Sequence, residues 1–199
     1  MKIALVTDTH FGARNDHDHF NNYFYEFYDN IFFPYLKEHN IDTCIHLGDV
    51  MDRRKFVSYK TAKDFREKFC ETFVTNDINV HMIVGNHDTY FKNTNEVNSL
   101  DELIGSRYEN IKIYRETETV DFDIPICFIP WINSTNEKQT IEHISKTNAT
   151  VAMGHLEIKG FEMHHGFPSE TGMEKSAFNK FDMVMSGHFH KKSDDGHIF

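Results

Sequence analysis

Residues 81–90 read HMIVGNHDTY, an apolar run that ends at Gly85 and is followed by Asn86, His87 and Asp88. A strand that ends in a turn needs only a glycine and one polar residue. Three consecutive groups able to bind metal ions or to move protons exceed that need. This stretch therefore predicts a buried strand whose carboxyl end carries a functional site.

Four more apolar runs end in the same manner. They are ALVT before Asp8 and His10, CIHLG before Asp49, VAMG before His155, and VMSG before His188 and His190. In open parallel sheets, ligands bind in the crevice at the carboxyl ends of the strands. A glycine precedes four of the five sites and allows the backbone to turn sharply and approach an ion closely. We therefore expect one crevice that holds seven candidate ligands: Asp8, His10, Asp49, Asn86, His155, His188 and His190.

The segments between the first three strands have helical patterns. Residues 18–37 carry aromatic side chains at helical spacing, and Pro34 is expected to disturb the end of that helix. Residues 58–74 form a second helical pattern, which Ser58 is suited to cap. This alternation predicts an α/β fold with a parallel sheet. Further strands are expected at 111–115, 118–122, 124–131, 150–154 and 182–187, helices at 100–105 and 136–147, and a loop at 164–176.

The totals bound the class of protein. The chain has 199 residues, of which 39% are hydrophobic and 26% are charged, as is typical of one globular domain. The first apolar run is too short for a signal peptide, and no stretch approaches the ~20 apolar residues of a membrane span. We therefore expect a cytoplasmic protein with no membrane contact. Its three cysteines, Cys44, Cys70 and Cys127, are expected to be buried and free.

The net charge of −10 disfavours a protein that binds nucleic acid through a general basic surface. It does not exclude a local site, because two divalent ions would bring four positive charges to one cleft. Seven ligands are too many for one tetrahedral zinc with an open position. They suit two ions ~3.5–4 Å apart that share a carboxylate. The mixture of imidazole, carboxylate and amide oxygen favours Mn²⁺, Fe²⁺ or Zn²⁺ over Ca²⁺ or Mg²⁺ alone.

Five motifs occur in order along the chain. They are the D-x-H of Asp8 and His10, then GDVMDR, GNHD, GHLE and GHFH. Together they resemble the calcineurin-like metallophosphoesterase superfamily from residue 8 to residue 190. The resemblance implies a four-layer αββα sandwich. It also implies that Asp8, His10 and His190 hold one ion, that Asn86, His155 and His188 hold the other, and that Asp49 bridges the two.

The resemblance further assigns a catalytic role to His87. This imidazole would protonate the leaving oxygen or stabilise charge on phosphorus, while a hydroxide activated by two metals attacks in line. Asp88 is expected to hold His87 by a hydrogen bond. Three arginines, Arg14, Arg53 and Arg54, follow ligand motifs and are candidates for contacts with phosphate, with a solvated surface role as the alternative.

Some stretches point to one branch of the superfamily. THFG, DRRK, IVGNHD and the IPW at Pro130 and Trp131 are similar to the SbcD-type nuclease subunits of bacterial and phage double-strand-break repair complexes. That similarity implies an Mn²⁺-dependent exonuclease and endonuclease that acts on DNA in repair and recombination, beside an SMC-like coiled-coil ATPase subunit. It implies a bacterial or phage-infected cell, and a homodimer if aromatic side chains of the 18–37 helix are exposed. Residues 1–199 would be the N-terminal nuclease domain of a longer chain with DNA-capping and ATPase-binding segments.

Other functions share these motifs. GDVMDR also resembles protein Ser/Thr phosphatases, but those usually read D-R-G and G-N-H-E where this chain has Arg54 and Asp88. A small-molecule phosphodiesterase is a second alternative, and a scaffold that keeps the fold without catalysis is a third. Every ligand type and His87 are present, which favours an enzyme. Some relatives carry histidine at the position of Asp52, so that side chain has no assigned role.

Overall fold

The computed structural model describes residues 1–164, 166–192 and 194–199. Its first sheet contains β1 (Ala4–Val6), β2 (Thr43–His46), β3 (Asn79–Ile83) and β4 (Ile111–Tyr114), all parallel and in chain order. Every residue of β2 is buried, and so is every residue of β3 except Asn79, because both faces of these strands are covered. The predicted parallel sheet is thus confirmed.

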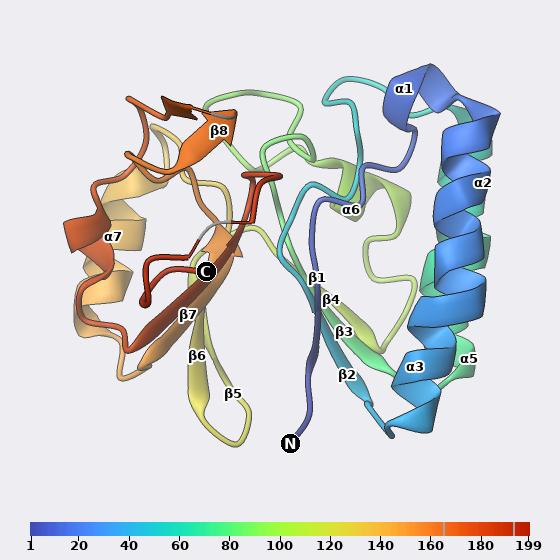
Figure 1. Ribbon diagram of the computed structural model, residues 1–199, viewed down its shortest axis with the longest axis horizontal. Coiled ribbons are helices and arrows are strands. Elements are labelled where there is room, and N and C mark those ends of the chain that lie inside the picture. Colours follow the sequence, from blue (N-terminus) through green and yellow to red (C-terminus); the bar gives the residue numbers. More distant parts are fainter. Residues whose placement is uncertain (165, 193) are drawn as a thin grey trace.

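The second sheet packs face to face against the first (Figure 1). Its strands lie in the order β10 (Met183–Gly187), β7 (Val151–His155), β6 (Pro125–Ile129) and β5 (Glu118–Asp121). β5 is antiparallel to β6, and the other pairs are parallel. Ile45, Ile83, Phe128 and Met153 are among the buried side chains between the two sheets. This core fixes the distance between the strand ends of one sheet and those of the other.

The first helical segment differs from the expected regular helix. It consists of α2 (Asp18–Phe27), a π-helical turn η1 (Tyr28–Phe32) and α3 (Phe33–Glu38). Pro34 lies in the first turn of α3, where its missing N–H is tolerated. The π-helical turn thus precedes Pro34, and the helix continues beyond the proline to Glu38. The wide turn relieves the clash of the proline ring with a carbonyl of the preceding turn.

The second helical segment comprises α4 (Tyr59–Phe65), η2 (Arg66–Cys70) and α5 (Glu71–Thr75). Ser58 caps it as predicted, because its Oγ accepts a hydrogen bond from the Thr61 N–H at 3.1 Å. Phe65, Phe69 and Phe73 project from this segment and are fully buried in the aromatic core beneath α2 and α3. Both helical segments thus cover the outer face of the first sheet (Figure 1).

The remaining elements complete the sandwich. Helix α7 (Glu137–Lys146) covers the outer face of the second sheet, so the four-layer αββα order is confirmed (Figure 1). Short elements lie in the connections: α1 (Ala13–Asp16), α6 (Ser99–Leu103), and a 3₁₀ turn η3 (Lys175–Phe178). The expected loop at 164–176 is partly wrong, because β9 (Phe167–Pro168) pairs with β8 (Glu162–His164) in a small hairpin. Such a short strand with a proline leaves no alternating pattern to read.

Two further expectations concern membrane-spanning segments and the cysteines. Across residues 1–164, 166–192 and 194–199, no helix is both long and apolar enough to cross a bilayer. The three cysteines are buried and free, as predicted. Burial raises the pKa of the Cys44 thiol to about 12, so this group stays protonated and unreactive at neutral pH.

Candidate metal centre

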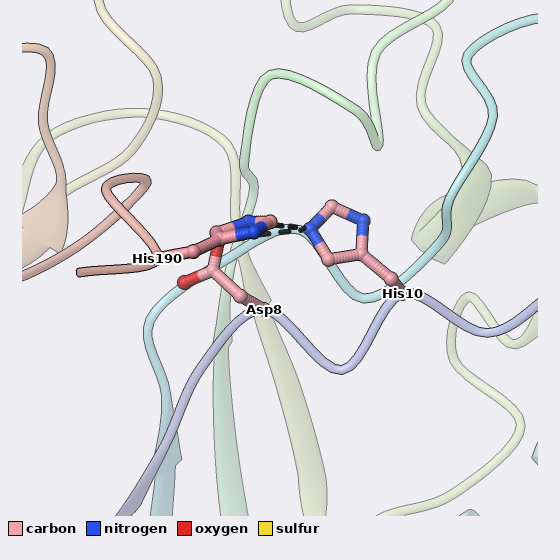
Figure 2. Close-up of side chains that lie close together, drawn as sticks. All are labelled: Asp8, His10 and His190. Atoms are coloured by element: carbon pink, nitrogen blue, oxygen red, sulfur yellow. Dashed lines mark hydrogen bonds and ion pairs between the residues drawn. The ribbon is translucent and has the colours of Figure 1, made fainter. Parts of the chain in front are cut away.

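The loops after β1 and β10 bring Asp8, His10 and His190 together, and Figure 2 shows their side chains converging from separate segments. His10 Nε2 lies 3.0 Å from His190 Nε2. Asp8 Oδ1 is 3.3 Å from His190 Nε2 and 3.7 Å from His10 Nε2. Ligands that share one ion at about 2.1 Å are separated by roughly 3.0–3.5 Å. These three side chains therefore have the spacing of one half of a metal centre.

A second group of ligands lies beside the first. Asn86 Oδ1 is 2.9 Å from both His155 Nε2 and His188 Nδ1. Asp49 Oδ2 is 3.2 Å from His155 Nε2 and 3.9 Å from His10 Nε2, so this carboxylate faces both groups. The structure thus brings together all seven side chains that the strand ends predicted. Asp49 occupies the position that a bridging ligand requires.

Four of the seven residues have a left-handed backbone. The φ angles are 53° for Asp8, 44° for His10, 54° for Asp49 and 89° for His188. A non-glycine residue in this region costs on the order of 1–3 kcal/mol and persists only where the surrounding structure enforces it. The sharp turns after β1, β2 and β10 enforce it here, because they aim these side chains back across the strand ends. Such a concentration of strain is typical of functional sites.

Glycines permit the close approach of the ligand loops. Gly48 has φ 99°, and a Cβ there would lie 2.5 Å from Nδ1 of His155. A Cβ at Gly85 would lie 2.2 Å from the backbone nitrogen of Asp49. Any larger residue would push the second sheet or the β2 loop away from the centre. The glycines before Asp49 and Asn86 are thus needed where loops from different strands touch.

The geometry agrees with a comparison against known families. A family model described as calcineurin-like phosphoesterase matches residues 1–192. The chain belongs to the calcineurin-like phosphoesterase family. Members of this family are phosphoester hydrolases that bind divalent metals, and the two groups of ligands described above are the candidate positions for such ions.

Individual relatives of this phosphoesterase have also been found. Exonuclease subunit 1 of Enterobacteria phage T4 is 34% identical over 199 residues, and this chain spans 58% of the length of that protein. The purple acid phosphatase PPD1 from yellow lupin seeds has a TM-score of 0.53 at 13% identity, over 94% of this chain and 37% of that one, which is a likeness of fold. A structure described as a novel archaeal phosphodiesterase has a TM-score of 0.42 at 19% identity, over 100% of this chain and 81% of that one.

The residues of the phosphoesterase fit a metal ion on grounds of their own. Asp8 Oδ1 is buried and has no hydrogen-bond partner among the described residues, as expected of an oxygen that faces an ion. Nδ1 of His155 lies 2.8 Å from the carbonyl oxygen of Leu47, which can only accept, so Nδ1 carries the proton. The other ring nitrogen, Nε2, is then free to bind a metal, which is the usual arrangement of a ligating histidine.

The charges at the centre also favour a cation. Burial disfavours the charged forms of Asp8 and Asp49. Other interactions, led by His10 at Asp8 and by His155 at Asp49, outweigh burial, so the pKa of each carboxyl lies below its usual range. Burial likewise disfavours a charged His155, but Asp49 and then Asp8 raise its pKa to about 9. The buried carboxylates thus demand positive charge close to them, which divalent ions supply.

His87 lies beside the centre and is held by the loop that follows Asp49. Its backbone N–H donates to Asp49 Oδ1 at 2.7 Å, and its Nδ1 donates to the carbonyl oxygen of Asp52 at 2.5 Å. This second bond leaves Nε2 directed away from the loop. Together with His10 and Asp49, His87 also forms a third group of possible ligands. The imidazole is therefore placed either to act on a substrate or to contact an ion.

The expected bond from Asp88 to His87 is wrong. The Asp88 carboxylate is fully buried and accepts hydrogen bonds from the backbone N–H groups of Met51 and Gly85, each at 2.9 Å. It thereby joins the loop after β2 to the loop after β3. Burial, followed by the charge of Asp49, raises the pKa of Asp88 to about 6. A buried carboxylate satisfies these two backbone donors instead of turning to His87, whose ring already has a partner.

The three candidate arginines occupy different positions. Arg14 is exposed, and its guanidinium lies 5.7 Å from the ring of Phe20. Arg53 is paired with the carboxylate of Asp16. Arg54 donates to Thr89 Oγ1 at 3.3 Å; burial lowers its pKa, and the charge of Asp49 partly opposes that shift. Among the three, Arg54 is the one that the structure places against the candidate centre.

Three supporting contacts were not identified from the sequence. Trp131 packs its indole against the imidazole of His188, with ring centroids 5.2 Å apart. The buried Asn95 donates to the carbonyl oxygen of Trp131 at 2.9 Å and so holds the tryptophan from the opposite loop. His46 is fully buried, and its Nε2 lies 3.0 Å from Oγ1 of Thr9, the residue between the candidate ligands Asp8 and His10. The IPW stretch signals Trp131, but nothing local signals its partners.

Proposed function

We propose that this phosphoesterase is a metal-dependent DNA phosphodiesterase, that is, a nuclease. The observation that carries the proposal is the convergence of seven ligand side chains around a shared Asp49, with the His87 imidazole beside them. Two ions held this way suit in-line hydrolysis of a phosphodiester. The 34% identity to a phage protein named exonuclease subunit 1 supports DNA as the substrate.

The set of ligands supports Mn²⁺ as the working ion, with Fe²⁺ or Zn²⁺ as alternatives. Four imidazoles, two carboxylates and one amide oxygen are a mixed nitrogen and oxygen set, which hard ions such as Mg²⁺ and Ca²⁺ do not prefer. Asp8, His10 and His190 would hold one ion, and Asn86, His155 and His188 the other, with Asp49 shared. When bound, the ions supply Lewis-acid charge for the phosphate and acidify water at neutral pH.

The protein groups near the ions have separable tasks in this proposal. The Nδ1 bond to Asp52 fixes one tautomer of His87, so Nε2 is the atom that exchanges a proton with the leaving oxygen. Arg54, anchored on Thr89, is the guanidinium best placed to contact a neighbouring phosphate. The Asp88 carboxylate keeps the Asp49 and His87 loops in register.

We also propose that the chain acts as one subunit of a DNA repair and recombination complex, with residues 1–199 as its nuclease domain. The phage relative is named as a subunit, and this chain spans 58% of its length. A coiled-coil ATPase of the SMC type is the partner that this proposal names. Copurification with such an ATPase from the same genome would test that part directly.

The first test is cleavage by the purified chain. We expect bis(p-nitrophenyl) phosphate and end-labelled DNA to be hydrolysed with Mn²⁺, with less turnover in Mg²⁺ and none after chelation, because the mixed set of ligands favours Mn²⁺. The measurement is the initial rate with each metal on single-stranded and double-stranded DNA. Product lengths separate exonuclease from endonuclease cleavage.

The substrate series also separates the alternatives. Preferential hydrolysis of p-nitrophenyl phosphate, a monoester, would support a phosphatase and contradict the nuclease. Turnover of the chromogenic diester but not of DNA would favour a small-molecule phosphodiesterase. Metal binding without turnover of any ester would indicate a scaffold.

A homodimer is part of the proposal, and α2–η1–α3 provides its surface. Five large apolar side chains at helical spacing on this segment are 39–70% exposed: Phe20, Tyr23, Phe27, Ile31 and Tyr35. Such a stripe on an outer helix marks an interface rather than a solvated face. In this proposal, some aromatic residues of the segment pack in the core and others contact the partner copy.

The double variant Phe27→Glu, Ile31→Glu is expected to convert a dimer into a monomer, because two carboxylates would be desolvated at each copy of the interface. Light scattering after size exclusion measures the mass, and the circular dichroism spectrum should not change. Phe167→Glu is the matched control, since Phe167 is 72% exposed on β9, away from the stripe. A wild-type chain that stays monomeric at high micromolar concentration would contradict the proposed dimer.

A further inference from the structure

Two loops leave the candidate centre side by side, residues 51–57 after the Asp49 turn and residues 89–98 after the His87 turn. Three contacts in succession join residues 51–57 to His87 and to residues 89–98. His87 Nδ1 donates to the Asp52 carbonyl, Arg54 donates to Thr89 Oγ1 at 3.3 Å, and Lys55 Nζ lies 5.8 Å from the ring centroid of Tyr90. The loops thus form one continuous surface that begins at the catalytic candidate and runs outward.

Exposed aromatic rings lie on this surface. We call Phe56, Tyr90 and Phe91 the aromatic platform; their exposed fractions are 62%, 40% and 48%. Tyr90 and Phe91 meet edge to face, with centroids 4.7 Å apart. Three large rings exposed beside one site are costly in water unless something covers them.

Contacts within the protein hold rings of the platform in place. The guanidinium of Arg53 lies 4.7 Å from the Phe56 centroid, and the Asp16 carboxylate holds that guanidinium by an ion pair. The backbone N–H of Tyr90 donates to the carbonyl oxygen of Val97 at 2.9 Å. Fixed rings lose little conformational entropy when a flat partner stacks on them.

Positive charge is interleaved with the rings. Residues 51–57 and 89–98 contain four lysines and arginines against two carboxylates, and with Arg53 paired to Asp16 the remaining cations are Arg54, Lys55 and Lys92, in a chain whose net charge is −10. Basic groups between exposed aromatic rings are the pattern that binds a single-stranded nucleic acid, with phosphates on the cations and unpaired bases on the rings. Paired bases cannot stack in this way because their faces are already covered within the duplex.

We infer that the aromatic platform binds the unpaired bases of a single DNA strand whose scissile phosphate lies at the candidate metal centre. This inference rests on the proposed nuclease function and adds to it a preference for single-stranded DNA next to the cut. A second copy of the chain is a poorer occupant, because the lysines and arginines between the rings would be desolvated without matching carboxylates.

The test is binding of labelled oligo-dT to the metal-free protein, measured by fluorescence anisotropy. Phe56→Ala and Tyr90→Ala are each expected to raise Kd for oligo-dT by about five- to hundredfold, the range of stacking contributions at such sites. An abasic oligomer of equal length keeps the phosphates but lacks the bases, so its Kd should be the same for the wild type and for both variants. Binding of a duplex of equal length should also be insensitive to both variants.

Controls separate this inference from the function on which it rests. Turnover of bis(p-nitrophenyl) phosphate with Mn²⁺ should be the same in the wild type and both variants; its absence in the wild type would contradict the nuclease itself. Ile124→Ala removes an exposed apolar side chain from the turn between β5 and β6 and should leave Kd for oligo-dT unchanged. Equal losses on oligo-dT and abasic DNA, an unaltered Kd, or a change of oligomeric state in Tyr90→Ala would each overturn the inference.

Discussion

Replacing Asp49 with asparagine is expected to lower kcat/KM for phosphodiesters by at least about 10³-fold, because the two ions would lose the carboxylate that they share, and with it several kcal/mol of Lewis-acid stabilisation. The Asp49 carboxylate faces both groups of ligands, at 3.2 Å from His155 and 3.9 Å from His10. The neutral amide retains the size of the side chain and can still accept the His87 N–H. The measurements are kcat/KM and metal content after equilibration with Mn²⁺.

Thermal unfolding supplies a second readout for the same variant. Mn²⁺ at 100 times its Kd should stabilise the wild type by about 2.7 kcal/mol for each ion bound, and this gain should be lost in Asp49→Asn. Asp52→Asn is the matched control: its carboxylate lies 3.7 Å from His10 Nδ1 but belongs to none of the ligand groups found in the described structure. We expect at most about a 100-fold loss there, as for groups that only orient ligands. The bridging role of Asp49 is refuted if Asp49→Asn binds both ions normally.

His87→Ala is expected to reduce kcat for DNA by about 10²–10⁴-fold, the usual contribution of a positioned proton donor. Metal content should stay at the wild-type level, because the seven other side chains provide the ligands. The loss should be smaller for bis(p-nitrophenyl) phosphate, since p-nitrophenolate leaves without being protonated. Rates on both substrates, compared in one preparation, measure this difference.

A drop in Mn²⁺ content would instead make His87 a ligand, which its proximity to His10 and Asp49 permits geometrically. Equal losses on both substrates would exclude the role of proton donor. His143→Ala is the control, because His143 lies on α7, which covers the outer face of the second sheet, and its Nε2 lies 2.9 Å from Thr119 Oγ1. That variant should retain full activity and full metal content.

The positions of the candidate ligands followed from local patterns. Each of Asp49, Asn86 and His155 comes directly after a buried strand and a glycine, and parallel strands present their carboxyl ends at one edge. Ser58 as a cap and the aromatic spacing of the first helix were equally local signals. Periodicity and capping depend on residues a few positions apart, so a single sequence contains them.

Contacts between distant segments were decided by the tertiary structure. Asp88 binds Met51, 37 residues away, instead of its neighbour His87, and His87 takes its partner from Asp52, 35 residues away. Distant packing also decides which side of the first helical segment is exposed. It likewise decides the contacts between residues 51–57 and 89–98 that support the aromatic platform. Sequence alone determined which residues reach the carboxyl edge of the sheets. Packing of the two sheets and their loops determined which atom each polar group contacts, because every buried donor and acceptor must find a partner among neighbours that only the fold supplies.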